Sequence, residues 1–218
     1  MKLAIYGTGG SGRELYEIIM ITREWDEKWE EFVFIDDTKP DGEFLSCRMV
    51  TFASFCQLYP TEGIEVAIAV GEPAARKTIY ERVTGAGYEL ATIIHPTCAL
   101  SPSAVFGRGV IVKDSVSISA GAVIKDNAYI NGISMIGHDV EIGEHCQISS
   151  HAVIAGNTKV GPGVYIGISA CVRDHIEIGE NAIISMGAVV MKNVRPNRVV
   201  MGNPAREIAE NREHQVFK

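Results

Sequence analysis

The sequence lacks the features that mark several large classes of protein. No apolar run is long enough to span a membrane, and the start, MKLAIYGTGG, is too short an apolar segment for a signal peptide. No basic stripe is present and the formal net charge is -7, which disfavours a nucleic-acid partner. An anionic ligand would have to be met by local Lys, Arg or backbone N–H groups.

Cysteine is sparse and scattered. The five cysteines are odd in number and include no C-x-x-C pair, which favours reduced thiols in a cytoplasm over a disulfide framework or a zinc site. Hydrophobic residues make up 46% of the 218 residues and charged residues 22%, an ordinary globular composition. We therefore expect a soluble cytoplasmic protein of one large or two modest domains.

The first ninety-five residues alternate apolar strands with helices. Strands are expected at 3–7, 31–36, 65–70 and 89–95, and helices at 13–25 and 71–87. Pro73 suits the first turn of the second helix, and Gly85 or Gly87 suits its end. Strands that alternate with helices predict an α/β domain with a parallel sheet.

From Leu100 to Val190 a large apolar residue recurs at every sixth position, and a mostly small residue lies two places before it. Neither a helix nor a plain strand has a period of six, and antiparallel strands would need turns of varied length. Hexapeptide periodicity predicts a parallel β-helix. Six residues form each flat face and eighteen form a triangular coil, so about five stacked coils are expected.

Several motifs in order resemble one known family. The repeat followed by VVMGNPARE (199–207) resembles the left-handed β-helix acyltransferases. The segments AIYGTGGSGRE, FVFIDD, AIAVGEPAARKTIYERV and ATIIHPTCALSPSA narrow this to bacterial nucleotide-aminosugar N-acetyltransferases and the related sialic acid O-acetyltransferases. The resemblance implies a Rossmann-like nucleotide-sugar-binding domain (1–95), a left-handed β-helix acetyltransferase domain with a C-terminal extension (96–218), and a homotrimer with acetyl-CoA between adjacent helices. Handedness follows from the resemblance alone, because ordinary parallel crossovers are right-handed.

GTGGSG (7–12) matches the G-x-G-x-x-G pattern between a strand and a helix, with Asp36 ending the next strand. NAD binding and a merely structural turn are alternatives, although four strands are fewer than a full dinucleotide fold uses. A nucleotide sugar needs only backbone N–H groups and a helix N-terminus for its phosphates. Asp36 and Asp37 could also be a solvated strand end. The resemblance implies eight contacts to the nucleotide sugar: Gly9, Ser11, Gly12, Arg13, Asp36, Asp37, Gly71 and Arg76.

The pair His138-Asp139 lies at an outward position of the repeat and matches the catalytic base motif of the family. A surface histidine is usually inert, but an unperturbed pKa near 6.5 suits a base at neutral pH. Asp139 or another nearby carboxylate could orient the ring. Gly156, eighteen residues on, should lie one coil away, about 4.8 Å along the stack. By resemblance its N–H holds the thioester carbonyl of acetyl-CoA.

Other site residues rest on the same resemblance. Ile168 and Met186, eighteen apart, would flank the pantetheine arm, or they pack at a subunit contact. Gln147 stands where the family commonly has a histidine near the acetyl group; it can hydrogen-bond but cannot titrate. Asn131 matches an I-N motif that contacts the sugar. Lys192 and Arg206 are the expected partners of the CoA phosphates.

We expect the chain to acetylate the 4-amino group of a nucleotide-linked 4-amino-4,6-dideoxy sugar, made for surface glycans, by direct transfer from acetyl-CoA with His138 as base. O-acetylation of sialic acid or another sugar, and a non-catalytic nucleotide-sugar-binding trimer, are the alternatives. A metal site like that of the γ-class carbonic anhydrases is disfavoured. No two of the candidate ligands are separated by a multiple of eighteen: His138, His145, His151 and His175.

Overall fold

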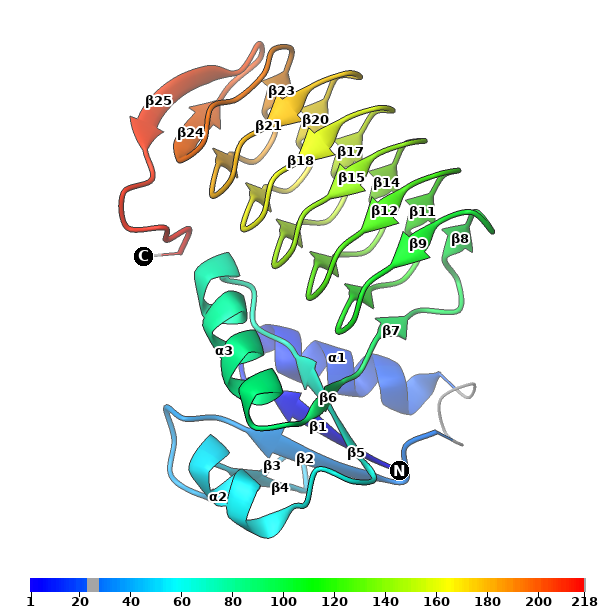
Figure 1. Ribbon diagram of the computed structural model, residues 1–218, viewed down its shortest axis with the longest axis vertical. Coiled ribbons are helices and arrows are strands. Elements are labelled where there is room, and N and C mark those ends of the chain that lie inside the picture. Colours follow the sequence, from blue (N-terminus) through cyan, green and yellow to red (C-terminus); the bar gives the residue numbers. More distant parts are fainter. Residues whose placement is uncertain (23–27, 218) are drawn as a thin grey trace. The chain divides into compact units, whose positions relative to one another are not determined.

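The computed structural model describes residues 1–22 and 28–217, which form two units (Figure 1). The first unit contains Met1–Gly71 and Thr78–Ala91, and the second contains Glu72–Lys77 and Thr92–Lys218. The boundary expected after residue 95 thus lies after Ala91, because Ile93 and Ile94 already form a strand of the coil. The last residues of the helix expected at 13–25 lie outside the described residues.

The first unit contains a six-stranded sheet in the order β3-β4-β2-β1-β5-β6. Its strands are parallel except for β3, which forms an antiparallel hairpin with β4. The parallel sheet is as predicted, whereas the hairpin and helix α2 were not predicted because both are short. The strands are β1 (Lys2–Tyr6), β2 (Glu31–Ile35), β3 (Gly42–Phe44), β4 (Cys47–Val50), β5 (Ile64–Ile68) and β6 (Glu89–Leu90).

Alternation along β1 divides the core of this unit between the two sheet faces. Ile5 lies on the face covered by α1 (Gly10–Ile21), which buries Leu15 and Ile19. Ala4 and Tyr6 belong to the opposite cluster, which includes side chains of α2 (Phe52–Leu58) and α3 (Pro73–Gly85). Both faces of the sheet are therefore buried, as expected for a parallel sheet between helices.

The second unit is a coil of three sheets, as in a left-handed β-helix, and their strands are parallel except for β25, which pairs antiparallel with β24. We name its faces after their first strands. The β7 face contains β7 (Ile93–Ile94), β10 (Ile111–Val112), β13 (Tyr129–Ile130), β16 (Gln147–Ile148), β19 (Tyr165–Ile166), β22 (Ile183–Ile184), β24 (Arg198–Met201) and β25 (Arg206–Glu210). The β8 face contains β8 (Ala99–Leu100), β11 (Ser117–Ile118), β14 (Met135–Ile136), β17 (Val153–Ile154), β20 (Cys171–Val172) and β23 (Val189–Val190). The β9 face contains β9 (Val105–Phe106), β12 (Val123–Ile124), β15 (Glu141–Ile142), β18 (Lys159–Val160) and β21 (Glu177–Ile178).

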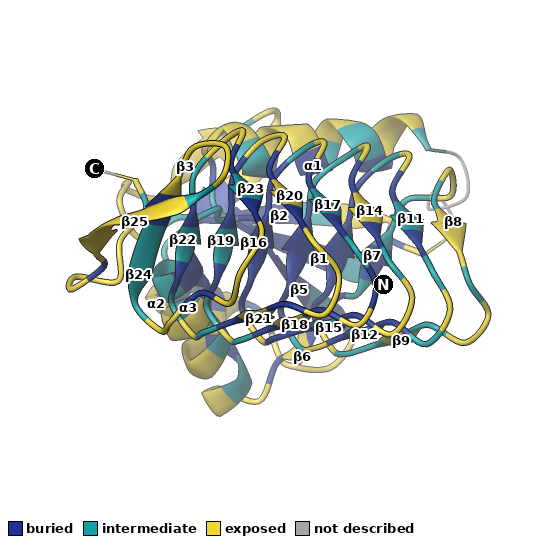
Figure 2. Cartoon of the chain, turned by 90° about the horizontal axis from the view of Figure 1, so that it is seen from above, coloured by how far each residue is buried: buried dark blue, intermediate teal, exposed yellow. Residues whose placement is uncertain are grey.

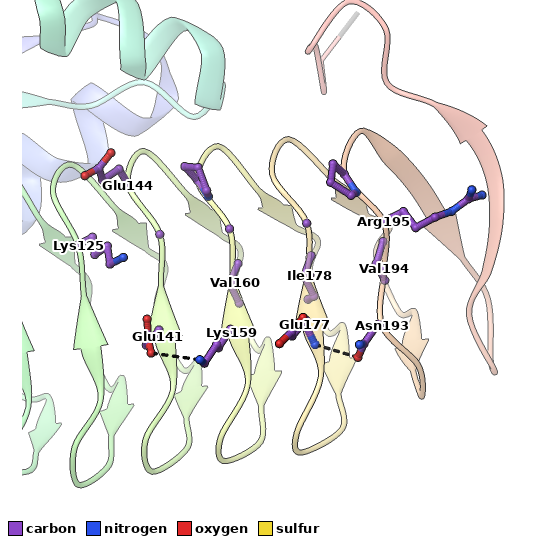
Figure 3. A pocket seen from close by; sticks show the side chains of 15 residues that line it. Lys125, Glu141, Glu144, Lys159, Val160, Glu177, Ile178, Asn193, Val194 and Arg195 are labelled. Atoms are coloured by element: carbon purple, nitrogen blue, oxygen red, sulfur yellow. Dashed lines mark hydrogen bonds and ion pairs between the residues drawn. The ribbon is translucent and has the colours of Figure 1, made fainter.

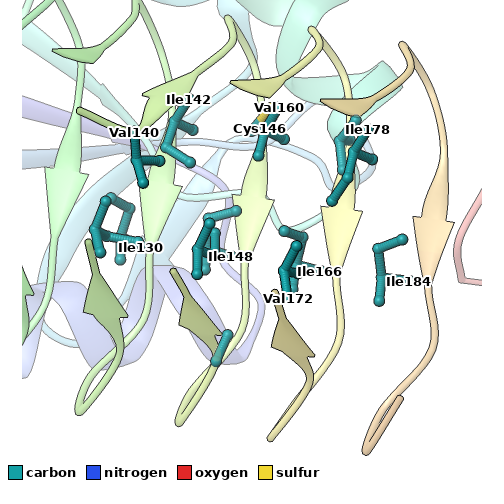
Figure 4. Close-up of a cluster of buried hydrophobic side chains, with 14 of the residues drawn as sticks. Ile130, Val140, Ile142, Cys146, Ile148, Val160, Ile166, Val172, Ile178 and Ile184 are labelled. Atoms are coloured by element: carbon teal, nitrogen blue, oxygen red, sulfur yellow. The ribbon is translucent and has the colours of Figure 1, made fainter. Parts of the chain in front are cut away.

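The eighteen-residue circuit is confirmed by the strand register. Ile130 pairs with Ile148, and Ile148 pairs with Ile166, so identical repeat positions stack. The stacked aliphatic side chains fill the coil interior (Figure 4). At the two ends of the coil the strands β8 and β25 are exposed (Figure 2). Burying one aliphatic side chain of the repeat contributes about 1.5–3 kcal/mol to stability. The stacked aliphatic side chains of the repeat form most of the core of this unit.

Candidate functional site

The glycine turn between β1 and α1 leaves open space beside the start of the helix. Neither Gly9 nor Gly10 has a neighbour where a Cβ atom would lie, and no side chain caps the helix at Gly9. A Cβ atom at Gly12 would overlap the carbonyl oxygen of Gly7, so the turn and the helix can approach only with glycine there. The turn thus has room and backbone N–H groups for an anionic group.

Asp36, directly after β2, lies against this turn. Thr8 donates a hydrogen bond to its carboxylate, and Thr38 donates two more. Burial raises the pKa of Asp36, but the hydrogen bonds from Thr38 and Thr8 outweigh burial and hold that pKa below its ordinary value. Lys39 Nζ donates to Thr8 Oγ1 at 2.7 Å. Lys39 was missed by the sequence analysis, and its position in TKPDG, just after the strand end, could have revealed it.

Asp37 has structural partners that the sequence analysis did not foresee. Its carboxylate accepts hydrogen bonds from Tyr6 Oη and Arg82 Nη1, and from the Phe52 N–H at 2.8 Å. Burial, followed by the hydrogen bond to Asp37, raises the pKa of Tyr6. Asp36 and Asp37 therefore have hydrogen-bond partners within the protein, while the Asp37 side chain is still 37% exposed. Their contact with a nucleotide stays a prediction. Of the other predicted contacts in this unit, Arg13 is exposed, and Ser11 and Gly71 are half-buried.

Arg76 is not available to a ligand, and the prediction that it contacts the nucleotide sugar is wrong. Its side chain is 0% exposed, and Nη2 donates to the carbonyl O and to Oδ1 of Asn127, each at 2.7 Å. The guanidinium also lies 5.2 Å from the ring centre of Tyr129. Desolvation lowers the pKa of Arg76 to about 10. The physical reason is complete burial against the coil, which the sequence does not reveal.

His138 and Gly156 occupy the same place in consecutive coils. Both lie in turns that lead from the β8 face to the β9 face, which we call the β8–β9 corner. The Asn157 N–H donates to the His138 carbonyl at 2.9 Å. A Cβ atom at residue 156 would lie 2.5 Å from His138 Nε2, so the imidazole lies directly over this glycine. The predicted base and the predicted oxyanion donor are therefore adjacent.

Asp139 is the carboxylate that contacts the imidazole of His138. His138 Nδ1 lies 2.9 Å from Asp139 Oδ2. A carboxylate only accepts, so Nδ1 carries the proton and neutral His138 has its lone pair on Nε2, the atom next to Gly156. Within the described residues, the Gly156 N–H donates to no acceptor. The corner thus offers a proton acceptor and a backbone donor side by side.

The same corner continues to Lys192, which follows β23 and is three coils from His138. Three coil steps correspond to about 14 Å. Lys192 and Arg206 line one cavity of about 610 Å³, together with Pro204 and Ala205 from the GNPA segment. The one acidic residue of this lining, Glu207, is paired with Arg195 at 2.6 Å. The two predicted phosphate partners therefore lie in one cavity with a local positive charge.

A different cavity, of about 670 Å³, lies on the β9 face (Figure 3). None of the predicted site residues lines it. Its charged side chains are of both signs and equal in number, so it offers no net positive charge to a polyanion. They are Lys125, Lys159, Arg195, Glu141, Glu144 and Glu177.

The remaining predicted residues lie elsewhere on the coil. Ile168 and Met186 are exposed in turns that lead from the β7 face to the β8 face, the β7–β8 corner, and the Gly187 N–H donates to the Ile168 carbonyl at 2.8 Å. Asn131 precedes the same corner, and its Nδ2 donates to the Ile148 carbonyl at 3.2 Å. One chain therefore does not bring these residues to His138, because the β8 face separates the two corners.

Gln147 lies on the β7 face, half a circuit from His138. Its side chain is 5% exposed, and its Oε1 has no hydrogen-bond partner within the described part of the chain. The predicted contact of Gln147 with the acetyl group therefore cannot be made beside His138 of the same chain.

The described residues contain neither a metal-binding cluster nor a membrane-spanning helix. Residues 1–22 and 28–217 contain no group of three or more His, Cys, Asp or Glu side chains arranged to hold a metal ion. No helix in these ranges combines the length and apolar character needed to cross a membrane.

Comparisons with known proteins match both units. Residues 2–83 match the family model described as PglD N-terminal domain, and residues 121–156 and 157–192 match the model for bacterial transferase hexapeptide repeats. The chain is 31% identical over 148 residues to the GDP-perosamine N-acetyltransferase of Escherichia coli O157:H7. That alignment covers 65% of this chain and 64% of the relative.

Solved structures match nearly the whole chain. The acetyltransferase domain of PglB from Neisseria gonorrhoeae FA1090 is 29% identical with a TM-score of 0.86, over 95% of this chain and 99% of that one. The same domain has been solved in complex with acetyl coenzyme A. PerB from Caulobacter crescentus, in complex with CoA and GDP-perosamine, is 25% identical with a TM-score of 0.82, over 96% of this chain and 98% of that one. These matches confirm the resemblance predicted from the sequence.

Proposed function

We propose that this chain, which belongs to the hexapeptide-repeat acetyltransferases with a PglD N-terminal domain, transfers the acetyl group of acetyl-CoA to the 4-amino group of a nucleotide-linked 4-amino-4,6-dideoxy sugar. One observation carries the proposal. The His138 imidazole, oriented through Nδ1 by Asp139, has its Nε2 over Gly156 at an exposed corner of the coil.

The chemistry is a direct transfer. The neutral amine nitrogen attacks the thioester carbonyl carbon, and His138 Nε2 takes the proton that the amine loses. The Gly156 N–H stabilises the negative charge on the carbonyl oxygen, and Asp139 stabilises the imidazolium. The C–S bond then breaks, and the proton passes to the departing CoA thiolate. A thiol nucleophile is not required, and Cys146 is unsuited to the role because burial raises its pKa to about 12.

Acetyl-CoA would lie along the β8–β9 corner. Lys192 and Arg206 would bind its phosphates, about 14 Å from His138, a span that an extended pantetheine arm can cover. The relatives support this, since the PglB domain binds acetyl coenzyme A and PerB binds CoA. The nucleotide sugar would use the open glycine turn, with Gly9, Ser11, Gly12 and Arg13 near its phosphates and Asp36 or Asp37 near the nucleoside.

The complete site would need two chains of a homotrimer. His138, Gly156 and Lys192 lie at one corner, and Asn131, Ile168 and Met186 lie at or beside the other. The β8 face between them has no charged outward residue, and several of its side chains are exposed, which suits a contact with a second copy. These outward residues are Ala99, Ser117, Met135, Val153, Cys171 and Val189. The β7–β8 corner of one chain would face the β8–β9 corner of the next, whereas Gln147 is already buried in its own chain.

The first test is an acetyl-transfer assay. Purified protein is incubated with acetyl-CoA and a panel of GDP-, UDP- and dTDP-linked 4-amino sugars, and free thiol is measured. GDP-perosamine comes first because one relative is named for it and PerB has been solved in complex with it. We expect thiol release that depends on the amine and an acetylated product of increased mass. Thiol release with sialic acid, and with none of the amino sugars, would show that the activity is O-acetylation and not N-acetylation. Saturable nucleotide-sugar binding without any release would indicate a non-catalytic trimer.

A mixing experiment tests the shared site. Chains carrying His138→Ala and chains carrying Met186→Arg should each be inactive, because each lacks one half of every site. Trimers containing both kinds of chain should regain measurable activity, since some contacts pair an intact β8–β9 corner with an intact β7–β8 corner. Inactive mixed trimers, shown by mass to contain both chains, would contradict the two-chain site.

A further inference from the structure

The carboxylate of Asp139 lies beside Gly121, the residue at the same place one coil earlier. A Cβ atom at residue 121 would lie 2.5 Å from Asp139 Oδ1 and 3.5 Å from its Cγ. The Asp139 N–H donates to the Ala120 carbonyl at 2.8 Å, which fixes the two turns against each other. Asp139 Oδ1 therefore occupies the space in which a side chain at residue 121 would begin.

This position brings the other carboxylate oxygen to His138. Asp139 Oδ2 lies 2.9 Å from His138 Nδ1. The side chains of His138 and Asp139 are 61% and 62% exposed, so little packing restricts the rotamer of either. An exposed pair of this kind contributes little unless its geometry is held. The space beside Gly121 accommodates Oδ1 on one side of the carboxylate while Oδ2 reaches the ring on the other.

The backbone at residue 121 does not by itself demand glycine. Gly121 has a φ of 69°. At the same place in later coils, Asp139, Asn157 and His175 take φ values of 56°, 59° and 56°, and all three carry side chains. The Gly121 N–H donates to Ser103 Oγ at 3.0 Å, so the turn is also fixed from the preceding coil. What glycine supplies at residue 121 is therefore space for the carboxylate.

We infer that Gly121 is a positioning residue for the acetyl transfer: because it has no side chain, the Asp139 carboxylate can take the position from which Oδ2 holds His138 Nδ1. This inference rests on the proposed function, in which His138 accepts the proton of the amine and Asp139 stabilises the imidazolium. Gly121 acts through Asp139 and is assigned no contact with either substrate. A side chain at residue 121 should therefore lower kcat and leave the KM values of both substrates nearly unchanged.

Gly121→Ala is the first variant. Its Cβ atom would meet the far end of the Asp139 side chain, and a rotation of that side chain moves the carboxylate away. We expect kcat to fall about 10- to 100-fold, as for the loss of a charge-assisted hydrogen bond, with both KM values little changed. In a crystal structure of the variant, the separation of Asp139 Oδ2 and His138 Nδ1 should exceed about 3.5 Å.

Gly163→Ala is the matched control. Gly163 has a φ of 66°, and a Cβ atom there would lie 2.5 Å from Asn181 Oδ1, one coil later. The change introduces the same backbone strain and displaces a similar side-chain oxygen, but in a turn that leads from β18 to β19. Both alanine variants should lower the melting temperature by a few degrees, whereas Gly163→Ala should keep its kcat. Gly121→Asn separates strain from space, because asparagine tolerates a positive φ, and it should lose activity as Gly121→Ala does.

A double-mutant cycle with Asp139→Gly tests whether Gly121 acts through the carboxylate. Glycine suits the φ of 56° at residue 139 and removes the side chain. In that background Gly121→Ala has no carboxylate to displace, so it should lower kcat no further than Asp139→Gly alone. Steady-state kinetics of the two single variants and the double variant measure this.

Three results would overturn the inference. The first is the same kcat for Gly121→Ala and Gly163→Ala, and the second is a further loss of kcat when Gly121→Ala is added to Asp139→Gly. The third is a crystal structure of Gly121→Ala in which the Asp139 carboxylate has not moved. If the unsubstituted protein transferred no acetyl group to any amine, the proposed function would fail, and the crystal structure would still test the position of the carboxylate. The two failures are therefore distinguishable.

Discussion

The imidazole of His138 lies over Gly156, the residue that stands at the same place one coil further along. A Cβ atom at residue 156 would come within 2.5 Å of Nε2 and 2.7 Å of Cε1. The two residues are held in this relation by backbone hydrogen bonds between coils, including that from the Asn157 N–H to the His138 carbonyl. The proton acceptor and the backbone donor thus have a common scaffold.

Gly156→Ala should reduce kcat by about 100-fold, a loss typical of a disturbed oxyanion donor. The added methyl group must displace the imidazole, because ring atoms occupy its place. Steady-state kinetics and thermal unfolding check this, and Gly85→Ala serves as control because a Cβ atom there meets nothing. Near-normal activity of Gly156→Ala would show that the ring does not need this position.

Asp139→Asn should lower kcat by roughly 10- to 100-fold, and His138→Ala by about 10²–10⁴-fold. Asparagine tolerates the positive φ of 56° at residue 139, so the turn should survive while the charge that stabilises the imidazolium is lost. Acetyl-CoA binding, followed by calorimetry, should be retained in both variants. The control is His175→Ala, which removes an exposed histidine one circuit beyond Asn157. Equal rates for His138→Ala and His175→Ala would contradict the base assignment.

Lys192→Ala and Arg206→Ala should each raise the KM for acetyl-CoA several-fold, with kcat little changed. Both side chains line the cavity of about 610 Å³, and each would lose a charge-assisted hydrogen bond worth roughly 1.5–3 kcal/mol before screening by solvent. The effect should shrink at high salt. Arg212→Ala, a change at an exposed arginine, should be neutral. If KM for the nucleotide sugar rose instead, the cavity would belong to the other substrate.

Asp36 should make the stability of the first unit pH-dependent. Its folded-state pKa is depressed below the ordinary value of 3.8, so its contribution is present above pH 3.8 and is lost as the pH falls through the folded-state pKa. Thermal unfolding between pH 7 and pH 3 should show a decline at the acid end. Asp36→Asn should lower the melting temperature at pH 7 and flatten that part of the profile. Parallel profiles for the two proteins would mean that the hydrogen bonds of Asp36 do not stabilise the fold.

The hexapeptide repeat is the part of the fold that could be predicted most fully from the sequence. Ile130, Ile142 and Ile154 follow one another at steps of twelve, and all three are buried in the coil as expected. The pairing of His138 with Gly156 followed from the same count. By contrast, the β3–β4 hairpin turns at Leu45 and Ser46, both at positive φ, and carries no glycine signal in that turn. Short elements of this kind depend on contacts with the rest of the sheet.

The sequence by itself determined the eighteen-residue circuit, because each large aliphatic residue must reach the coil interior and a slip of one residue would expose the whole series. It therefore also determined that residues 138, 156 and 192 share a corner. Only the tertiary structure decided which carboxylate meets His138, that Arg76 is buried against Asn127, and that Glu72 faces the C-terminal segment. Such contacts join residues far apart in the chain, or depend on the direction of a single side chain, and no local periodicity encodes either.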